Sequence, residues 1–263
     1  MLLRSIRNGF SRGVLEIKIF SRQRESVFFT LAFPVLLLFI FGSVFNKSIA
    51  PGVSFSQYFV AGMIASGLVN TGFQNLAILI PMERDFGTLK RLRGTPLNAA
   101  SYFIGKAVLV FVSMFIQVVI LLVVGIIFYH VHLPSTASLW LRFIWVLSLG
   151  LATSAILGIA FSSVLRNGRT ASVVATPIVI ILQFFSGVFF VFTQLPHWMQ
   201  QFADFFPLRW ITLGMRSVFL PDNFKQQEVG HSWKLNLVAI NLLIWLIVGL
   251  VISLRNFSWS KEE

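Results

Sequence analysis

The stretch Pro81–Pro96, with the sequence PMERDFGTLKRLRGTP, is a charged, amphipathic segment between two apolar runs at 58–80 and 107–128. Each run holds about 20 residues, which at 1.5 Å of helical rise per residue matches the ~30 Å hydrocarbon core of a bilayer. The pattern therefore predicts two membrane-spanning helices joined by a short polar element. Apolar runs of this length are typical of membrane-spanning helices and therefore indicate a helical membrane protein.

The composition of the whole chain supports the same fold class. Hydrophobic residues make up 56% of the 263 residues and charged residues 11%, with a mean hydropathy of +0.83. Soluble domains carry about 25% charged residues. We therefore expect an all-α integral membrane protein whose transmembrane domain, 27–254, holds six spans at about 27–45, 58–80, 107–128, 139–164, 173–192 and 235–254.

The basic residues predict the topology. Fifteen of the 21 Lys and Arg residues fall in 1–26, 81–106, 165–169 and the tail 255–263, and six fall on the opposite side. Because basic residues gather on cytoplasmic loops, we expect both chain ends and the 81–106 loop in the cytoplasm, with the protein in the plasma membrane. The same rule accounts for the net charge of +12. We do not expect the chain to bind nucleic acid, because it has no soluble domain that could present a basic face.

Residues 1–26 predict an amphipathic helix lying in the membrane interface, with a plain positive-inside anchor as the alternative. A cleaved signal peptide fits poorly, because the basic region is too long and the following apolar run exceeds a typical signal core. The predicted apolar stripe repeats at steps of three and four and consists of Leu3, Ile6, Phe10, Val14 and Ile17.

Enzymatic and metal-binding functions find little support. The chain has no Cys, which excludes disulfides and thiolate metal sites, and its nine acidic residues lie outside the clean apolar runs, which disfavours an ion-coupled carrier. Among the four His residues only His130 and His132 are close in sequence. No phosphate-binding loop occurs, so we expect no ATP hydrolysis and no cofactor bound by this chain.

Three amides within predicted spans are candidates for a pathway or an interface. Asn70 and Gln74 lie four residues apart and share one face of the second span, and Gln183 lies in the fifth. Amides in a span either hold helices together or line a pathway, and the sequence leaves both functions open.

The region between the fifth and sixth spans, 193–234, is apolar and aromatic but interrupted by prolines and charges. Backbone at membrane depth must satisfy its own hydrogen bonds, which two short re-entrant helices would achieve. An amphipathic loop on the outer surface is the alternative. We expect Arg209 and Arg216 to reach the outer headgroups or nearby carbonyl groups, with Asp204 as a possible partner. The candidate residues of this external hairpin are Pro196, Trp198, Pro207, Arg209 and Arg216.

The charged segment itself predicts a short helix with an apolar ridge. Phe86, Leu89 and Leu92 are three residues apart and are flanked by basic residues, with Glu83 and Asp85 at the N-terminal end where the helix dipole favours negative charge. Such a helix fits a groove on a soluble partner. A short interfacial helix with snorkelling basic side chains is the alternative.

With these features in this order, the whole chain resembles an ABC-2 type permease subunit, from the class of drug, polysaccharide and lipid exporters and nearest its drug-exporter branch. The specific part of the resemblance is Glu83-Arg84-Asp85-Phe86-Gly87-Thr88-Leu89 followed by Thr95-Pro96. The stretch from Pro207 to Arg216 is similar to the family's proline-to-arginine pattern in the external hairpin.

The resemblance implies an ATP-driven exporter in which two permeases, identical or homologous, pair with two separate ATPase subunits that bind ATP and Mg²⁺. The substrate would be amphipathic, drug-like or lipid-linked and would move outward. A membrane scaffold, an intramembrane enzyme or a channel without ATP coupling are the competing classes. The residues that the resemblance assigns to ATPase coupling are Glu83, Asp85, Phe86, Gly87, Thr88, Leu89, Arg91, Leu92, Thr95 and Pro96.

Overall fold

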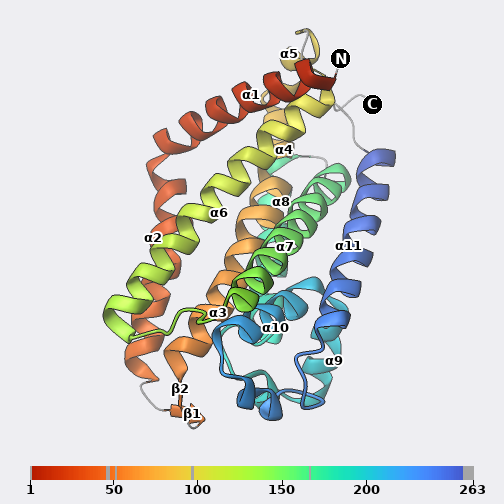
Figure 1. Cartoon of the computed structure of the whole chain (residues 1–263). Coiled ribbons are helices and arrows are strands. Elements are labelled where there is room, and N and C mark those ends of the chain that lie inside the picture. Colours follow the sequence, from red (N-terminus) through yellow and green to blue (C-terminus); the bar gives the residue numbers. More distant parts are fainter. Residues whose placement is uncertain (1, 46–47, 51, 96–97, 166, 257–263) are drawn as a thin grey trace.

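The computed structural model describes residues 2–45, 48–50, 52–95, 98–165 and 167–256 (Figure 1). Apart from a small antiparallel hairpin of β1 (Ser48–Ala50) and β2 (Val53–Ser54), the described chain consists of helices and short connections. The expected all-α fold with six candidate spans is confirmed. The six helical segments long and apolar enough to cross a membrane are Arg24–Val44, Phe55–Asp85, Ala99–Tyr129, Ala137–Val164, Gly168–Phe185 and Leu235–Asn256.

The second span forms the centre of the bundle. It comprises α3 (Phe55–Leu68), the π-helical turn η1 (Val69–Gln74) and α4 (Asn75–Asp85), and every residue of α3 is buried. Small residues make this burial possible. A Cβ atom added to Gly62 would lie 2.9 Å from the carbonyl oxygen of Val188, so the backbones meet directly there.

Five further long helices pack around this centre. In Figure 1, α2 and α6 lie on one side of the second span and α7 and α11 on the other, with α8 behind them. α11 packs on α7, and α8 packs on α4. The bounds of these helices are α2 (Arg24–Val44), α6 (Ala99–Tyr129), α7 (Ala137–Val164), α8 (Gly168–Phe185) and α11 (Leu235–Asn256).

The ends of several spans differ from the sequence prediction. The second span starts earlier because Ser54 caps it, accepting a hydrogen bond from the Gln57 backbone. The third starts at Ala99 because the Asn98 side chain caps that helix in the same way. The fifth ends at Phe185, well before the predicted residue 192, and Gly187 follows it in the left-handed region, with φ of 75°.

The N-terminal helix α1 (Leu2–Arg22) lies obliquely across one end of the bundle and packs on α6 (Figure 1). Gly9 and Gly13 form the contact face, since a Cβ atom at either would come within 2.6 Å of an α6 side chain. Of the predicted apolar stripe, Ile6, Phe10 and Val14 are 38%, 57% and 64% exposed and Ile17 is half-buried, while the side chain of Leu3 lies outside the described ones. The helix is amphipathic as expected, and its place in the membrane interface stays a prediction.

The region between the last two spans forms a helical hairpin. Its α10 is buried among α3, α7 and α11, which disfavours a loop lying on the outside of the bundle. The β hairpin and this region lie at the end of the bundle opposite to α5, the start of α1 and the end of α11 (Figure 1). The elements of the region are η2 (Phe192–Gln194), α9 (His197–Phe205), α10 (Pro207–Phe219) and η3 (Asp222–Gln227).

Candidate functional site

The charged segment after the second span is bent by a glycine. Gly87 adopts a φ of 68° and precedes the short helix α5 (Thr88–Arg93). The predicted apolar ridge is therefore wrong. Phe86 lies before the bend and is 71% exposed, whereas Leu89 lies after it and is fully buried in the core. Leu92 is partly buried against the same core.

Glu83 belongs to a buried ion network and not to the start of a docking helix. Its carboxylate lies 2.5 Å from the Lys106 ammonium and accepts a hydrogen bond from the Tyr102 hydroxyl at 2.6 Å. Lys106 is fully buried and lies 3.0 Å from Glu16, which in turn pairs with Arg12 at 2.6 Å. Two cations and two carboxylates balance, so the network joins α1, α4 and α6 without leaving a buried net charge.

The next two residues hold the turn between α7 and α8. Arg84 is buried and donates to the carbonyl oxygens of Ser162, at 3.5 Å, and Leu165, at 3.2 Å. Asp85 accepts a hydrogen bond from the backbone N–H of Gly168 at 2.7 Å. A cation thus faces the C-terminal end of α7 and an anion the N-terminal end of α8, which suits both helix dipoles.

The residues predicted to couple to an ATPase differ in their surroundings. The side chains of Glu83, Asp85 and Leu89 have partners within the fold, although Asp85 is exposed, and Pro96 lies outside the described residues. Gly87, Thr88 and Leu92 are half-buried. The other exposed residues of the predicted set are Phe86, Arg91 and Thr95.

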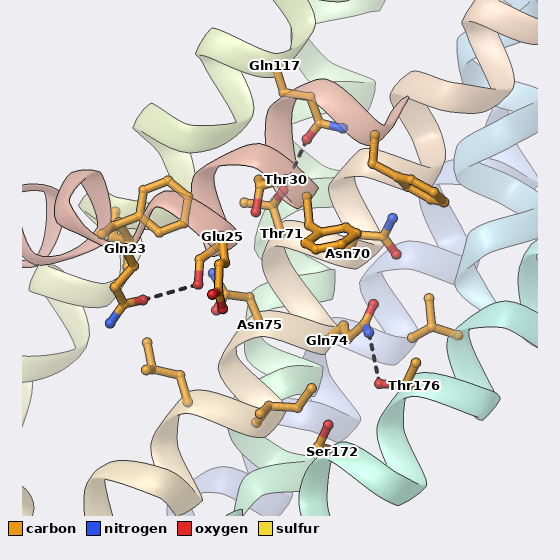
Figure 2. Close-up of a pocket in the computed structure, with 18 of the residues that line it drawn as sticks. Gln23, Glu25, Thr30, Asn70, Thr71, Gln74, Asn75, Gln117, Ser172 and Thr176 are labelled. Atoms are coloured by element: carbon orange, nitrogen blue, oxygen red, sulfur yellow. Dashed lines mark hydrogen bonds between the residues drawn. The ribbon is translucent and has the colours of Figure 1, made fainter. Parts of the chain in front are cut away.

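A cavity of about 720 Å³ lies beside the charged segment, between α1, α2, the second span, α6 and α8. The structure brings the three predicted amides together along it. Gln183 donates to the Asn70 side-chain oxygen at 2.8 Å. Gln74 donates to the Thr176 hydroxyl at 3.1 Å (Figure 2). These amides hold the second and fifth spans together and also line the cavity, and their function in a pathway stays a prediction.

The polar side of the cavity is shaped by the π-helical turn, which the sequence analysis missed. The Asn75 N–H donates to the Asn70 carbonyl, five residues back, and π-helical turns occur frequently at functional sites. The turn lies directly on α7, because a Cβ atom on Gly158 would be 2.6 Å from the Phe73 carbonyl oxygen. Thr71 extends the polar wall by donating to Gln117 at 3.2 Å (Figure 2).

At the opposite end of the bundle, the two predicted hairpin arginines share a carboxylate that sequence reasoning missed. Glu228 lies 3.2 Å from Arg209 and 3.3 Å from Arg216, and all three side chains are buried. The guanidinium carbons lie 3.6 Å from the ring centroid of Phe192 and 3.8 Å from that of Tyr58, respectively. Of the two expected environments, the carbonyl groups are confirmed for Arg216, which donates to the Gly187 carbonyl oxygen, whereas burial of both side chains contradicts contact with the headgroups.

The other candidate residues of the hairpin lie at the starts of its helices or on its surface. Pro207 is the first residue of α10, where its missing N–H is not needed, and Pro196 precedes α9. Trp198 is 59% exposed. Asp204 lies 3.6 Å from Arg209, as the sequence suggested. Partial burial raises the pKa of the Asp204 carboxyl above its usual range, and the Arg209 charge acts against this rise.

This six-span helical fold, with a charged turn at one end and a polar-lined cavity beside it, defines a membrane transport permease. The profile of the ABC-2 type transporter family matches residues 14–220, which is most of the chain. The chain belongs to this family and is a multi-pass membrane protein. In the part that the structure describes, no group of three or more His, Asp or Glu residues could hold a metal ion.

Two curated relatives are transport permeases by name. The chain is 28% identical over 241 residues to the "Putative transport permease ycf38" of Cyanophora paradoxa, which covers 87% of this chain and 79% of that protein. It is 27% identical over 190 residues to the "Probable multidrug ABC transporter permease YbhR" of Escherichia coli strain K12, covering 72% of this chain and 50% of that protein. This chain thus matches half the length of the second relative.

Proposed function

We propose that this chain is the membrane subunit of an ATP-driven exporter, powered by ATPase subunits on separate chains. Family membership supports a transport permease. The structure at the end of the second span supports the further proposal that a separate ATPase drives it. There, three consecutive charged residues tie α4 to α1, α6 and the α7–α8 turn. The chain then bends at Gly87 and presents Phe86 to solvent.

This arrangement suits the transmission of force from a soluble partner. A partner that moves α5 also moves the end of α4, and through its charged residues the ends of four other helices. The exposed surface consists of one aromatic ring with basic and polar neighbours, which fits an apolar pocket with an acidic rim. We assign ATPase docking to Phe86, Arg91 and Thr95, with Glu83, Asp85 and Leu89 positioning them.

The complete transporter would contain two ATPase subunits, which bind ATP and Mg²⁺, and two permeases, either two copies of this chain or this chain and a homologue. The permease would lie in the plasma membrane with both ends in the cytoplasm. It would move an amphipathic, drug-like or lipid-linked substrate outward. A scaffold or channel without ATP coupling is the alternative function.

The decisive experiment is co-expression of the tagged chain with a candidate ABC-type ATPase of the same organism. We expect the two to copurify in detergent, and we expect inverted vesicles containing both to accumulate substrate only with ATP and Mg²⁺. Stable membrane expression without ATPase binding, or transport that is independent of ATP, would reject the exporter and favour the alternative.

The orientation has its own test, because the chain contains no Cys. Single Cys residues at Ser5, Asn98, Ser135 and Asn223 can be labelled in intact cells with an impermeant thiol reagent. We expect labelling at the last two positions only. Labelling at Asn98 but not at Asn223 would invert the topology.

A further inference from the structure

We propose that the cavity beside the second span binds an organic cation: a hydrophobic molecule with one positive charge, held by the Glu25 carboxylate and the aromatic rings of Phe29 and Phe33. The inference rests on the proposed function, because it names the substrate class of that transporter. Its evidence comes from the charges, rings and hydrogen bonds that surround the cavity.

The charges around the cavity are unlike those of the chain as a whole. The chain carries 21 Lys and Arg residues against nine Asp and Glu residues. Among the described residues that line the cavity are three carboxylates, Glu16, Glu25 and Glu83, but no Lys, Arg or His. An anionic ligand would therefore meet carboxylates and no opposite charge, whereas a cation would meet complementary charge.

Only one of the three carboxylates is available to a ligand. Glu16 and Glu83 are neutralised by Lys106 and Arg12 in the buried network. Glu25 is exposed and makes no ion pair within the part of the chain that the structure describes. It lies in the first turn of α2, where the helix dipole favours its charge, and it lines the cavity together with Asn75 of α4 (Figure 2).

An aromatic wall continues from this carboxylate. Glu25, Phe29 and Phe33 follow at steps of four and so share one face of α2. The two rings are 63% and 42% exposed, with their centroids 6.3 Å apart. Ring faces attract a cation electrostatically, and a carboxylate at the end of such a stripe places opposite charge where the cationic centre would sit.

The opposite wall is polar and uncharged. The amide nitrogens of Gln183 and Gln74 donate to Asn70 and Thr176. Within the described chain, the side-chain carbonyl oxygens of Gln183 and Gln74 accept no hydrogen bond. The wall thus offers these oxygen acceptors to a cation, alongside amide donors such as that of Gln117, and adds no positive charge. The volume of about 720 Å³ lies within the range of small-molecule sites, roughly 300–1,000 Å³.

The test uses two ions of nearly equal shape and opposite charge, tetraphenylphosphonium and tetraphenylborate. The full chain is placed in phosphatidylcholine nanodiscs, and binding is measured by equilibrium dialysis against empty nanodiscs. We expect saturable binding of the phosphonium and none of the borate. Glu25→Gln should weaken phosphonium binding about tenfold, since one charge contact is lost. Asp222→Asn, which removes the same charge at the opposite end, should leave binding unchanged.

A second variant keeps the test decisive should Glu25→Gln fail to fold. Phe29→Leu retains the carboxylate and an apolar side chain but removes a ring face, and should also weaken phosphonium binding. Saturable borate binding of equal strength, or phosphonium binding insensitive to both variants, would overturn the inference. No binding of either ion, with cross-linking between Glu25→Cys residues of two copies, would overturn it too and assign this face to a second permease.

The assay contains neither ATPase nor ATP, so its outcome is separate from the proposed function. A negative binding result rejects the cation as ligand and leaves ATPase copurification and ATP-driven transport to decide the exporter. A positive result with no ATPase partner would keep the cation site and reject the exporter.

Discussion

Each end of the helical bundle contains a buried cluster of charges, and the two clusters are built differently. At the α5 end, Lys106 and Arg12 face Glu16 and Glu83, so the charges balance. At the hairpin end, two buried arginines face one buried carboxylate, Glu228. Asp204, the other carboxylate near them, has a side chain that is 45% exposed.

Both clusters contain buried polar atoms that find no hydrogen-bond partner among the described residues: the Arg12 Nε and Glu16 Oε1 atoms at the α5 end, and the Arg209 Nε and Nη1 and Arg216 Nε atoms at the hairpin end. They differ in that the faces of aromatic rings cover both guanidinium groups at the hairpin end. The balanced cluster links three helices that are distant in sequence. The unbalanced cluster depends on one carboxylate. The comparison teaches that removing one acid at the hairpin end should cost more than removing the lysine at the other.

The largest effect is therefore expected for Glu228→Gln. The change leaves two buried guanidinium groups without a buried carboxylate, and the free energy of unfolding should fall by about 3–5 kcal/mol. Chemical unfolding in mild detergent, followed by Trp fluorescence, measures this change. Asp222→Asn is the control, because its exposed side chain should contribute no more than ~0.5 kcal/mol. Equal stability of the two variants would break the comparison.

Lys106→Met is expected to have the next largest effect, at about 3 kcal/mol in the same unfolding assay. The loss should be smaller because Glu16 retains Arg12 and Glu83 retains the Tyr102 hydroxyl. A double variant, Glu83→Gln with Lys106→Met, removes both charges together. We expect it to regain about 1 kcal/mol over Lys106→Met alone, and a strictly additive loss would contradict the balanced network.

Phe86 and Leu89 test whether the charged segment contains both an exposed docking residue and a buried structural residue. Leu89→Ala should lower the free energy of unfolding by about 2 kcal/mol or more, because the side chain is fully buried. Phe86→Ala should change it by no more than ~0.5 kcal/mol, because the ring is exposed. If Phe86 forms the docking contact, only its variant combines normal stability with weak ATPase copurification. Normal copurification of Phe86→Ala would remove this residue from the interface.

The smallest effect is expected at the bend. Gly87→Ala places a side chain in the left-handed region and should cost about 1 kcal/mol, with open space around the new Cβ atom. Gly94→Ala is a matched control, because Gly94 has an ordinary φ of −77°. If both variants have the same unfolding free energy, the bend is not under conformational strain.

The sequence predicted the spans well because length and hydropathy alone define them. Their ends depend on single caps such as Ser54 and Asn98, whose effect a hydropathy pattern does not contain. The charged segment was found but misinterpreted, since residues were counted at helical spacing through Gly87. The partners of Glu83 lie on two other helices, and no local pattern connects them.

In the hairpin, too, features within one helix were predictable from the sequence, whereas contacts between segments far apart in the chain were not. Pro207 and the spacing of Arg209 and Arg216 predicted a helix with both arginines on one side, and α10 has this form. Glu228 was missed because it follows the short polar helix η3 and carries no sequence signal of burial. The cavity was only partly foreseen: its amides were recognised, but its wall on α2 depends on how two helices far apart in sequence come together.

The glycine face of α1 has a consequence for how the protein is made. Glu16 acquires its lysine only when α6 has been synthesised, and the nearest neighbours of Gly9 and Gly13 are also residues of α6. We therefore expect α1 to stay at the membrane surface during translation, through its exposed apolar residues, until the third span arrives. We expect nascent chains truncated before residue 99 to leave Gly13→Cys open to thiol reagents, and chains extended through residue 129 to protect it.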